Sequence, residues 1–192
     1  MEEILIVFLY SYLLGSIPFG LILSQVFLEK DIRKSGSGNI GATNVLRTGG
    51  KFLSLLTLFL DGAKGYLAVF LTSRYSVDYL IFSSLIVFIG HLFPVWLRFK
   101  GGKGVATYVG ILFAIDLFYP IVFIIIWILI IFVYKYASLA SLISTLIVFV
   151  FSVFSKGLGQ SLILFIFLIL IIFTHRTNIW RLKSGKEEKI NL

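Results

Sequence analysis

Long runs of apolar residues, separated by short polar segments, are the feature that most constrains what this chain can fold into. A helix that crosses the roughly 30 Å hydrocarbon core of a bilayer needs about 20 residues. The runs predict seven such helices, near residues 3–27, 51–73, 78–98, 104–118, 120–135, 138–155 and 159–176. Charged residues make up only 14% of the chain, against about 25% in a soluble domain. We therefore expect an all-α, polytopic membrane helix bundle that forms one domain over residues 1–192.

Two of these predicted helices leave an alternative open. The fourth and fifth are short and meet at Asp116 to Pro120, so a re-entrant hairpin there would leave five true spans. The first apolar run follows Glu2 and Glu3 and has no small-residue cleavage site after it, so it reads as a spanning helix and not as a removable signal peptide.

The distribution of lysine and arginine predicts the orientation of the chain in the membrane. With the amino terminus outside, the inward loops and the tail hold fourteen of these residues and the outward loops only two, Arg74 and Lys156. Positive residues near helix ends stay on the cytoplasmic side. We therefore expect a multi-pass membrane protein with its carboxyl terminus in the cytoplasm. The net charge of +8 is then explained by topology, and nucleic acid is not an expected partner.

Three polar clusters fall on the predicted cytoplasmic side, near residues 29–50, 98–104 and 174–192. In the first, glycines admit turns whose amides can converge on an anion, and hydroxyls and amides add donors. Arg47 adds a fork suited to phosphate oxygens. The second cluster repeats this logic with Lys103 as a point charge. The candidate substrate-binding residues of these two loops are Gly36, Ser37, Gly38, Asn39, Thr43, Asn44, Gly101, Gly102, Lys103 and Gly104.

Two familiar phosphate-binding motifs do not apply to these loops. Gly36, Gly38 and Gly41 match G-x-G-x-x-G, but a βαβ unit cannot form between membrane-spanning helices. Lys103 is followed by Gly104 where a Walker motif requires serine or threonine. Glycines at a short cytoplasmic turn are also common without any ligand, so a purely structural reading of both loops stays open.

Helix 51–73 contains two opposite charges, Asp61 and Lys64, at membrane depth. Charges in a bilayer face a partner or an aqueous cavity because isolated charges are costly there. At positions i and i+3 the two can pair and fix helix packing, which gives Asp61 a structural role. Alternatively, Lys64 borders an anionic substrate. His91, next to the Pro94 break, is expected to bond to a freed backbone carbonyl.

The third cluster contains the better histidine candidate for chemistry. His175 lies at the end of the last helix with Asn178 one turn further on. A simple helix-end role is the alternative. The chain has no cysteine, so a thiol nucleophile and disulfides are excluded, and we expect no metal and no cofactor. Many acyltransferases use a histidine with an aspartate five positions later; this dyad is absent because positions 96 and 180 are tryptophan.

Three segments together resemble a known family. SGSGNIGATNVLR, GHLFPVWLRFKGGKGVAT and THRTNIWRLKSGKEE, in this order and spacing, are similar to the signature motifs of the bacterial integral-membrane glycerol-3-phosphate acyltransferases that use acyl phosphate as donor. DGAKG, around Asp61 and Lys64, also matches this family.

The resemblance implies roles for individual residues. Ser35 and Arg47 would be essential for catalysis, His175 and Asn178 would be active-site residues, and Gly101 to Gly104 with Lys103 would form the glycerol 3-phosphate site. Glu187, or its neighbour Glu188, would be structural.

The resemblance also implies a reaction. The acyl group of acyl phosphate would move to the 1-hydroxyl of glycerol 3-phosphate, giving lysophosphatidic acid and phosphate for phospholipid synthesis. The lipid bilayer of the bacterial inner membrane would be its environment, with the active site facing the cytoplasm, and an enzyme that makes acyl phosphate would be its functional partner. A small membrane transporter or channel for an anionic metabolite is the alternative, although such proteins often contain inverted repeats and this chain has no internal repeat.

Overall fold

The computed structural model describes residues 2–190, without the side chains of residues 158–160. All regular structure in this part of the chain is helical, as the apolar runs predict. The contacts divide it into two compact units, residues 2–115 and 116–190, which are described separately below. The expectation of one domain stays a prediction.

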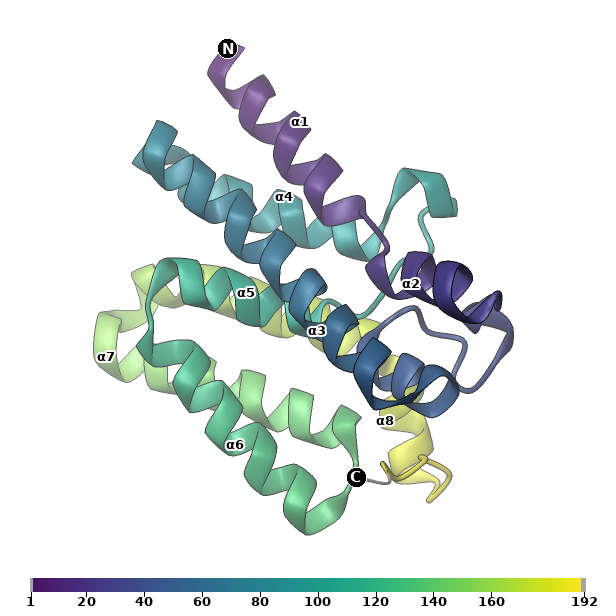
Figure 1. Cartoon of the computed structure of the whole chain (residues 1–192). Coiled ribbons are helices and arrows are strands. Elements are labelled where there is room, and N and C mark those ends of the chain that lie inside the picture. The colour runs from purple at the N-terminus through teal and green to yellow at the C-terminus, as the bar shows by residue number, and fades with distance from the viewer. Residues whose placement is uncertain (1, 191–192) are drawn as a thin grey trace. The chain divides into compact units, whose positions relative to one another are not determined.

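The first unit contains five α-helices and three short 3-10 turns (Figure 1). They are α1 (Glu2–Ser16), α2 (Phe19–Leu28), η1 (Ile32–Lys34), α3 (Ala42–Tyr75), η2 (Val77–Tyr79), α4 (Leu80–Leu92), η3 (Val95–Leu97) and α5 (Val105–Ile115). The most extensive pairings are α1 with α4 and α3 with α5.

Glycines bring both helix pairs of the first unit into close backbone contact. A Cβ atom added to Gly15 of α1 would lie 2.1 Å from the carbonyl oxygen of Val87 in α4. Between α3 and α5, a Cβ on Gly110 would lie 1.9 Å from the carbonyl oxygen of Gly62. Small residues at a helix contact let the two backbones approach closely. Such close packing drives helix association in a membrane, where the hydrophobic effect does not favour one helix contact over contact with lipid.

The second unit contains α6 (Phe118–Tyr134), α7 (Ala137–Thr174) and α8 (Arg176–Lys183). Helix α7 folds back on itself at Gly157, whose φ of 79° and ψ of 168° lie outside the helical region. The sequence predicts two helices over this range, 138–155 and 159–176, and the break between them is confirmed. α6 packs against α7, and α8 continues from α7 with a bend of 61°.

Four helical segments among the described residues are long and apolar enough to cross a membrane: Glu2–Leu28, Ala42–Tyr75, Val77–Leu97 and Ala137–Gly157. The bent pair Ser161–Thr174 and Arg176–Lys183 would make a fifth. Val105–Ile115 and Phe118–Tyr134 are apolar but shorter. The membrane bundle is therefore confirmed, while the count of seven spans, the re-entrant alternative and the orientation stay predictions.

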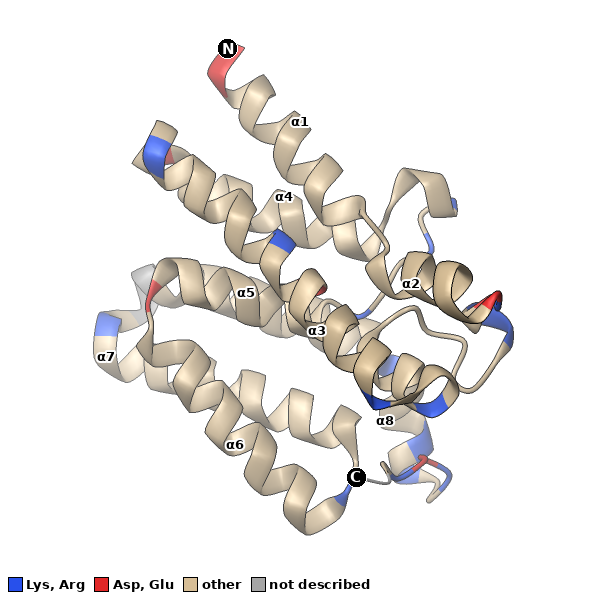
Figure 2. Ribbon diagram, in the orientation of Figure 1, with Lys and Arg blue, Asp and Glu red and all other residues tan. Residues whose placement is uncertain are grey.

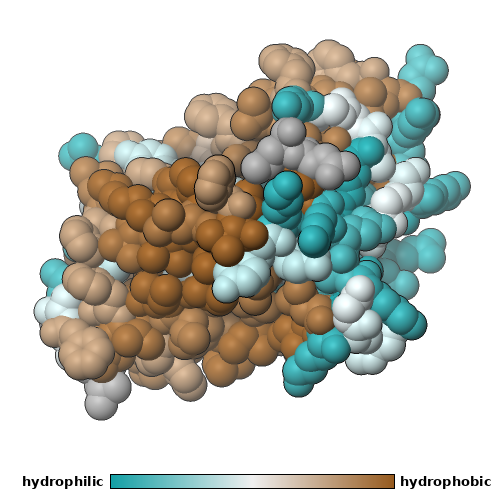
Figure 3. Space-filling view, turned by 90° about the horizontal axis from the view of Figure 1, so that it is seen from below, coloured by the Kyte–Doolittle hydropathy of each residue, from teal (hydrophilic) through white to brown (hydrophobic). Residues whose placement is uncertain are grey.

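Large apolar side chains cover much of the outer surface, as lipid contact requires. Figure 3 shows a broad area of hydrophobic residues bordered by hydrophilic ones. On α6, the side chain of Phe132 is 80% exposed. In water such a continuous apolar surface would be an association site, so its extent indicates a protein embedded in lipid.

The predicted helix at residues 3–27 is wrong in one respect, because it is interrupted between α1 and α2. Pro18 lies between them, and its ring and missing N–H prevent a regular helix. A break inside a span frees backbone carbonyls that must find donors. The indole Nε1 of Trp96 donates to the carbonyl of Ser16 at 2.6 Å, and the Nζ of Lys64 donates to that of Ile17 at 2.7 Å.

Candidate active site

The loop before α3 is held in shape by one buried side chain, Asn44. Its Oδ1 accepts a hydrogen bond from the amide of Ser37 at 2.8 Å. Its Nδ2 lies 2.8–3.1 Å from the carbonyl oxygens of Ile32, Ser35 and Asn39. The loop passes so close that a Cβ at Gly36, where φ is +58°, would lie 2.3 Å from Asn44 Oδ1. Asn44 therefore orders this loop from within, and its predicted contact with substrate stays a prediction.

Several donors of this loop remain open. Within the described residues, the hydroxyls of Ser35, Ser37 and Thr43 make no hydrogen bond, and no side chain caps α3 at Gly41. The first amides of a helix are unsatisfied donors at the positive end of its dipole. A concave turn with open hydroxyls beside an uncapped helix start is suited to an oxyanion.

Arg47 is placed by helix geometry on the same side of α3 as Thr43. The two residues are one turn apart, at i and i+4, and Arg47 is partly exposed. The predicted cation and hydroxyl of this motif are therefore on one helix face. Gly50, with φ of 84° and ψ of 177°, then kinks α3. The predicted helix start at residue 51 corresponds to this kink.

The η1 turn at the start of this loop is fixed by an exposed ion pair. Asp31 caps η1 by accepting from the amide of Arg33 at 3.0 Å, and it also binds the Arg33 guanidinium at 2.7 Å. The hydrogen bond from the Arg33 side chain lowers the pKa of Asp31 to about 2. Asp31 therefore stays ionised at any physiological pH.

An apolar cluster anchors the first loop to the protein. Ile32, Ile40 and Val45 are buried together with Leu21 of α2 and Leu53 of α3, and Leu97 of η3 packs against this cluster. Since only three residues separate the end of η3 from Gly101, the first and second polar loops both adjoin this apolar cluster. The segments around residues 32–45 and 97–104, which are far apart in the sequence, therefore lie close together in the first unit.

The loop Gly101 to Gly104 lies against the end of α4. The amides of Gly101 and Gly102 donate to the carbonyls of Leu92 and His91 at 3.0 and 3.1 Å. A Cβ on Gly102 would lie 2.2 Å from Nε2 of His91, and one on Gly104 would lie 2.4 Å from the ring of Phe88. Glycine is required here because the backbone itself touches the side chains below. Lys103 is partly exposed between these fixed glycines.

Lys64 and Asp61 are confirmed as an ion pair. Nζ of Lys64 lies 2.8 Å from Oδ1 of Asp61, and both side chains are buried. Nδ1 of His91 lies 3.8 Å from the same Asp61 oxygen and makes no hydrogen bond within the described residues. The expected bond from His91 to a carbonyl freed at Pro94 is therefore wrong. The carbonyls before Pro94 accept from other groups: that of Phe93 from the hydroxyl of Tyr12 at 2.8 Å, and those of Leu92 and His91 from the glycine amides of the following loop.

The second unit holds the third polar cluster. Nδ1 of His175 lies 2.8 Å from the carbonyl of Ile171, and both His175 and Asn178 are buried. The carboxylate of Glu187 accepts from Asn178 at 2.7 Å, from Ser138 at 2.7 Å and from Arg181 at 3.0 Å. These contacts are those that a structural role for Glu187 requires. The Oδ1 atom of Asn178 is buried and has no hydrogen-bond partner among the described residues.

In each unit, most lysine and arginine residues are concentrated in a few turns and helix ends (Figure 2). In the first unit they lie around η1, the start of α3 and the η3–α5 connection, and in the second around α8 and the tail. The far end of the second unit carries Lys156 near Asp116, 3.9 Å apart. Arg181 and Lys183 are in the last turn of α8. The role of His175 and Asn178 as active-site residues stays a prediction.

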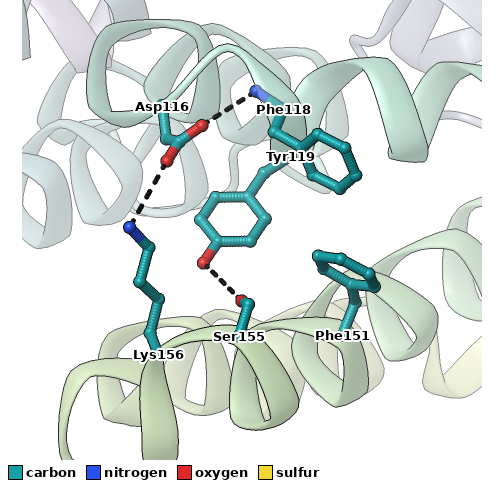
Figure 4. Close-up of a pocket in the computed structure, with 6 residues that line it drawn as sticks. All are labelled: Asp116, Phe118, Tyr119, Phe151, Ser155 and Lys156. Carbon is teal, nitrogen blue, oxygen red and sulfur yellow. Dashed lines mark hydrogen bonds and ion pairs between the residues drawn. The ribbon is translucent and has the colours of Figure 1, made fainter.

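A pocket of about 150 Å³ lies in the second unit, away from all predicted site residues. Figure 4 shows its walls. Asp116 accepts from the amide of Phe118 at 2.9 Å and pairs with Lys156, while Tyr119 and Ser155 face each other at 3.4 Å. Both charged groups are well exposed, so this is a surface hollow at a helix turn. No group of three or more metal-ligating side chains occurs among residues 2–190.

The fold and the loops define an integral membrane protein whose polar turns present open donors and cations at helix ends. A family model described as glycerol-3-phosphate acyltransferase matches residues 5–185. The chain belongs to this glycerol-3-phosphate acyltransferase family. The transporter alternative is therefore not retained.

Individual relatives match over almost their entire lengths. A glycerol-3-phosphate acyltransferase of Pelagibacter ubique is 52% identical over 190 residues, which is 99% of both chains. One of Mesorhizobium japonicum is 46% identical, covering 97% of this chain and 96% of the relative. The crystal structure of PlsY (YgiH), an integral membrane glycerol 3-phosphate acyltransferase, in its glycerol 3-phosphate form has a TM-score of 0.93 at 36% identity, covering 98% of this chain and 96% of that one. Its lysophosphatidic acid form has a TM-score of 0.89 at 35% identity, with the same coverage.

Proposed function

We propose that this protein transfers the acyl group of acyl phosphate to the 1-hydroxyl of glycerol 3-phosphate, giving lysophosphatidic acid and inorganic phosphate. The family name gives the acceptor, and the PlsY relative has been solved in a glycerol 3-phosphate form and in a lysophosphatidic acid form. The observation that carries the proposal concerns the first loop. There the side chain of Asn44 hydrogen-bonds to backbone groups, while the hydroxyls of Ser35, Ser37 and Thr43 make no hydrogen bond within the described residues and can bind a ligand.

Acyl phosphate suits such a site because its chemistry requires little activation. It is a mixed anhydride with phosphate as a good leaving group, so no covalent acyl-enzyme is needed. The acceptor hydroxyl attacks the acyl carbon, the new ester C–O bond forms, and the bond to the phosphate oxygen breaks. The hydroxyl proton goes to His175 or to the departing phosphate.

The residues of the two loops would stabilise charge in this reaction. Open hydroxyls and amides of the first loop would hold the oxyanion and the leaving phosphate, which is a preorganised electrostatic contribution. Arg47 and Lys103 would bind phosphate groups, Arg47 as a fork and Lys103 as a point charge. Binding both substrates in one orientation would add the advantage of proximity. This assignment keeps Lys64 in its ion pair with Asp61 and leaves its contact with substrate a prediction.

The proposed cellular setting follows from the same chemistry. The acceptor is water-soluble and the product enters the bilayer, so loops at the cytoplasmic face of the bacterial inner membrane would meet both. A soluble enzyme that makes acyl phosphate would supply the donor, and an enzyme that acylates lysophosphatidic acid would consume the product.

Purified protein in detergent, supplied with acyl phosphate and glycerol 3-phosphate, tests the activity directly. We expect lysophosphatidic acid and phosphate in equal amounts, and Ser35→Ala to lower kcat by about a hundredfold. Ser73→Ala is the matched control, because its hydroxyl bonds to Phe70 within its own helix at 2.7 Å. No product from the wild-type protein would rule out the proposal.

Rapid mixing separates direct transfer from a covalent mechanism. Without glycerol 3-phosphate, direct transfer releases no phosphate beyond slow hydrolysis. A burst of phosphate equal to the amount of enzyme would show that an acyl-enzyme forms, and would overturn direct attack.

A further inference from the structure

The buried charges of the first unit form an array that connects two distant parts of the backbone. Asp61 lies at its centre, with Lys64 Nζ at 2.8 Å and His91 Nδ1 at 3.8 Å from the same oxygen. All three side chains are at most 4% exposed. Charged groups in a membrane protein are costly to bury even as a pair, so their retention calls for a function.

One end of the array fixes the break in the first span. Lys64 donates to the carbonyl of Ile17 at 2.7 Å, and its ammonium lies 5.8 Å from the ring centre of Phe19. The ammonium thus joins α3 to the α1–α2 break. The bond from Lys64 to Ile17 and the ion pair with Asp61 would by themselves fix the packing of α3 against this break.

The other end of the array lies beneath the glycine–lysine loop. The ring of His91 occupies the place that a Cβ of Gly102 would need, and its carbonyl accepts the Gly102 amide. Gly101 is equally close, because a Cβ there would lie 2.1 Å from the His91 carbonyl oxygen. A displacement of His91 would therefore displace both glycines, and with them Lys103.

We infer that His91, buried beside the Asp61–Lys64 pair, is a positioning residue that sets the place of Gly101 to Gly104 and so the affinity for the phosphate of the acceptor. The inference rests on the proposed function, in which Lys103 binds glycerol 3-phosphate. His91 acts through the loop and does not touch the substrate. The first loop also comes close to the α1–α2 break, because a Cβ on Gly20 of α2 would lie 2.0 Å from the carbonyl oxygen of Ile40.

His91→Ala, which opens the space under Gly102, is the first test. We expect KM for glycerol 3-phosphate to rise about tenfold or more, since a small displacement of a positioning group is costly. KM for acyl phosphate should stay within about twofold, because the first loop is unchanged. Asp61→Asn should act in the same direction. Ser84→Ala is the control, as its buried hydroxyl bonds only within α4, to Leu80 at 2.7 Å.

A second measurement does not depend on activity. Hydrogen exchange at the amides of Gly101 and Gly102 should be at least about tenfold faster in His91→Ala than in the wild type or in Ser84→Ala, because their acceptors move. A wild-type protein without acyltransferase activity would defeat the proposed function, yet the exchange rates would still decide whether His91 positions the loop.

The close contact between Gly102 and the His91 ring provides a third test. Gly102→Ala should raise KM for glycerol 3-phosphate because its methyl group meets the His91 ring, and His91→Ala in the same chain should restore part of the loss by giving the methyl room. Folded His91→Ala protein with wild-type KM and wild-type exchange would overturn the inference. Loss of thermal stability with both values unchanged would overturn it as well, since that is the result of a purely structural role.

Discussion

Asn44 illustrates how one amide can define a whole loop. It satisfies carbonyls that a glycine-rich turn cannot pair through regular structure, and it accepts the Ser37 amide at the same time. Buried backbone groups must be paired, and each unpaired one costs about 1–3 kcal/mol. The open hydroxyls around it are therefore available for a ligand without loss of loop order.

An isosteric pair of substitutions tests this role. Asn44→Asp turns a donor into an acceptor that faces three carbonyl oxygens, and we expect a loss of about 3 kcal/mol in stability with faster exchange of the amides of residues 35–41. Asn39→Asp is the control, because the Oδ1 that accepts the Gly41 amide at 2.9 Å is retained. Thermal unfolding in detergent and hydrogen exchange measure both. Equal losses of stability in Asn44→Asp and Asn39→Asp would show that Asn44 does not order the loop.

The residues of the candidate site were predictable to an unequal degree. Ser35, Arg47 and Lys103 stand out because polar and glycine-rich segments contrast with an apolar chain, and composition alone reveals that. The role of Asn44 and the ring of His91 under Gly102 depend on contacts between residues far apart in sequence. Local patterns carry no record of such contacts.

At the scale of elements, the apolar runs predicted nearly every helix and the break at Gly157, but they did not predict the interruption at Pro18 or the helical turns before Gly50. The break at Pro18 was missed because the apolar run continues through it. The kink at Gly50 was missed for another reason: the segment before it is polar, yet it is helical and begins at Ala42. Hydropathy reports burial in lipid, whereas helix ends depend on backbone pairing.

The contact between α3 and α5 gives a prediction with an internal control. Gly110→Ala places a methyl group 1.9 Å from the Gly62 carbonyl oxygen, so the helices must separate. We expect a loss of about 1–3 kcal/mol and a lower Tm. In Gly62→Ala the new Cβ would lie 3.5 Å from the Ala106 carbonyl oxygen, which is ordinary contact. A Tm for Gly110→Ala as high as that for Gly62→Ala would refute the close packing.

The tail of the second unit offers another prediction. Glu187 joins α7, α8 and the tail through Ser138, Asn178 and Arg181. Glu187→Gln should cost about 1–2 kcal/mol, because it removes the charge that Arg181 and the amide of Asn178 require. Glu188→Gln should cost less. Thermal unfolding of the two variants decides which of the adjacent acids is structural, and a larger loss in Glu188→Gln would reverse the assignment.

At the scale of the whole molecule, the orientation in the membrane is open to a clean experiment. The chain has no cysteine, so any single cysteine introduced is the sole thiol. We expect Asn39→Cys to react with a membrane-impermeant maleimide only after the cells are opened, because positive loops stay inside. Arg74→Cys should react in intact cells. Labelling of position 39 from outside would contradict the orientation and the cytoplasmic placement of the loops.

The break between α1 and α2 has a consequence for biosynthesis. Residues 2–28 are made and enter the bilayer first, while the two side chains that satisfy the freed carbonyls, Lys64 and Trp96, follow much later in the chain. Until about half of the protein has left the ribosome, the carbonyl oxygens of Ser16 and Ile17 lack these two donors, although Ile17 accepts the amide of Phe19 at 3.2 Å within the first span. Its final shape is therefore acquired late, and a nascent chain that stops before the third span must shelter those oxygens with water or with the translocation machinery.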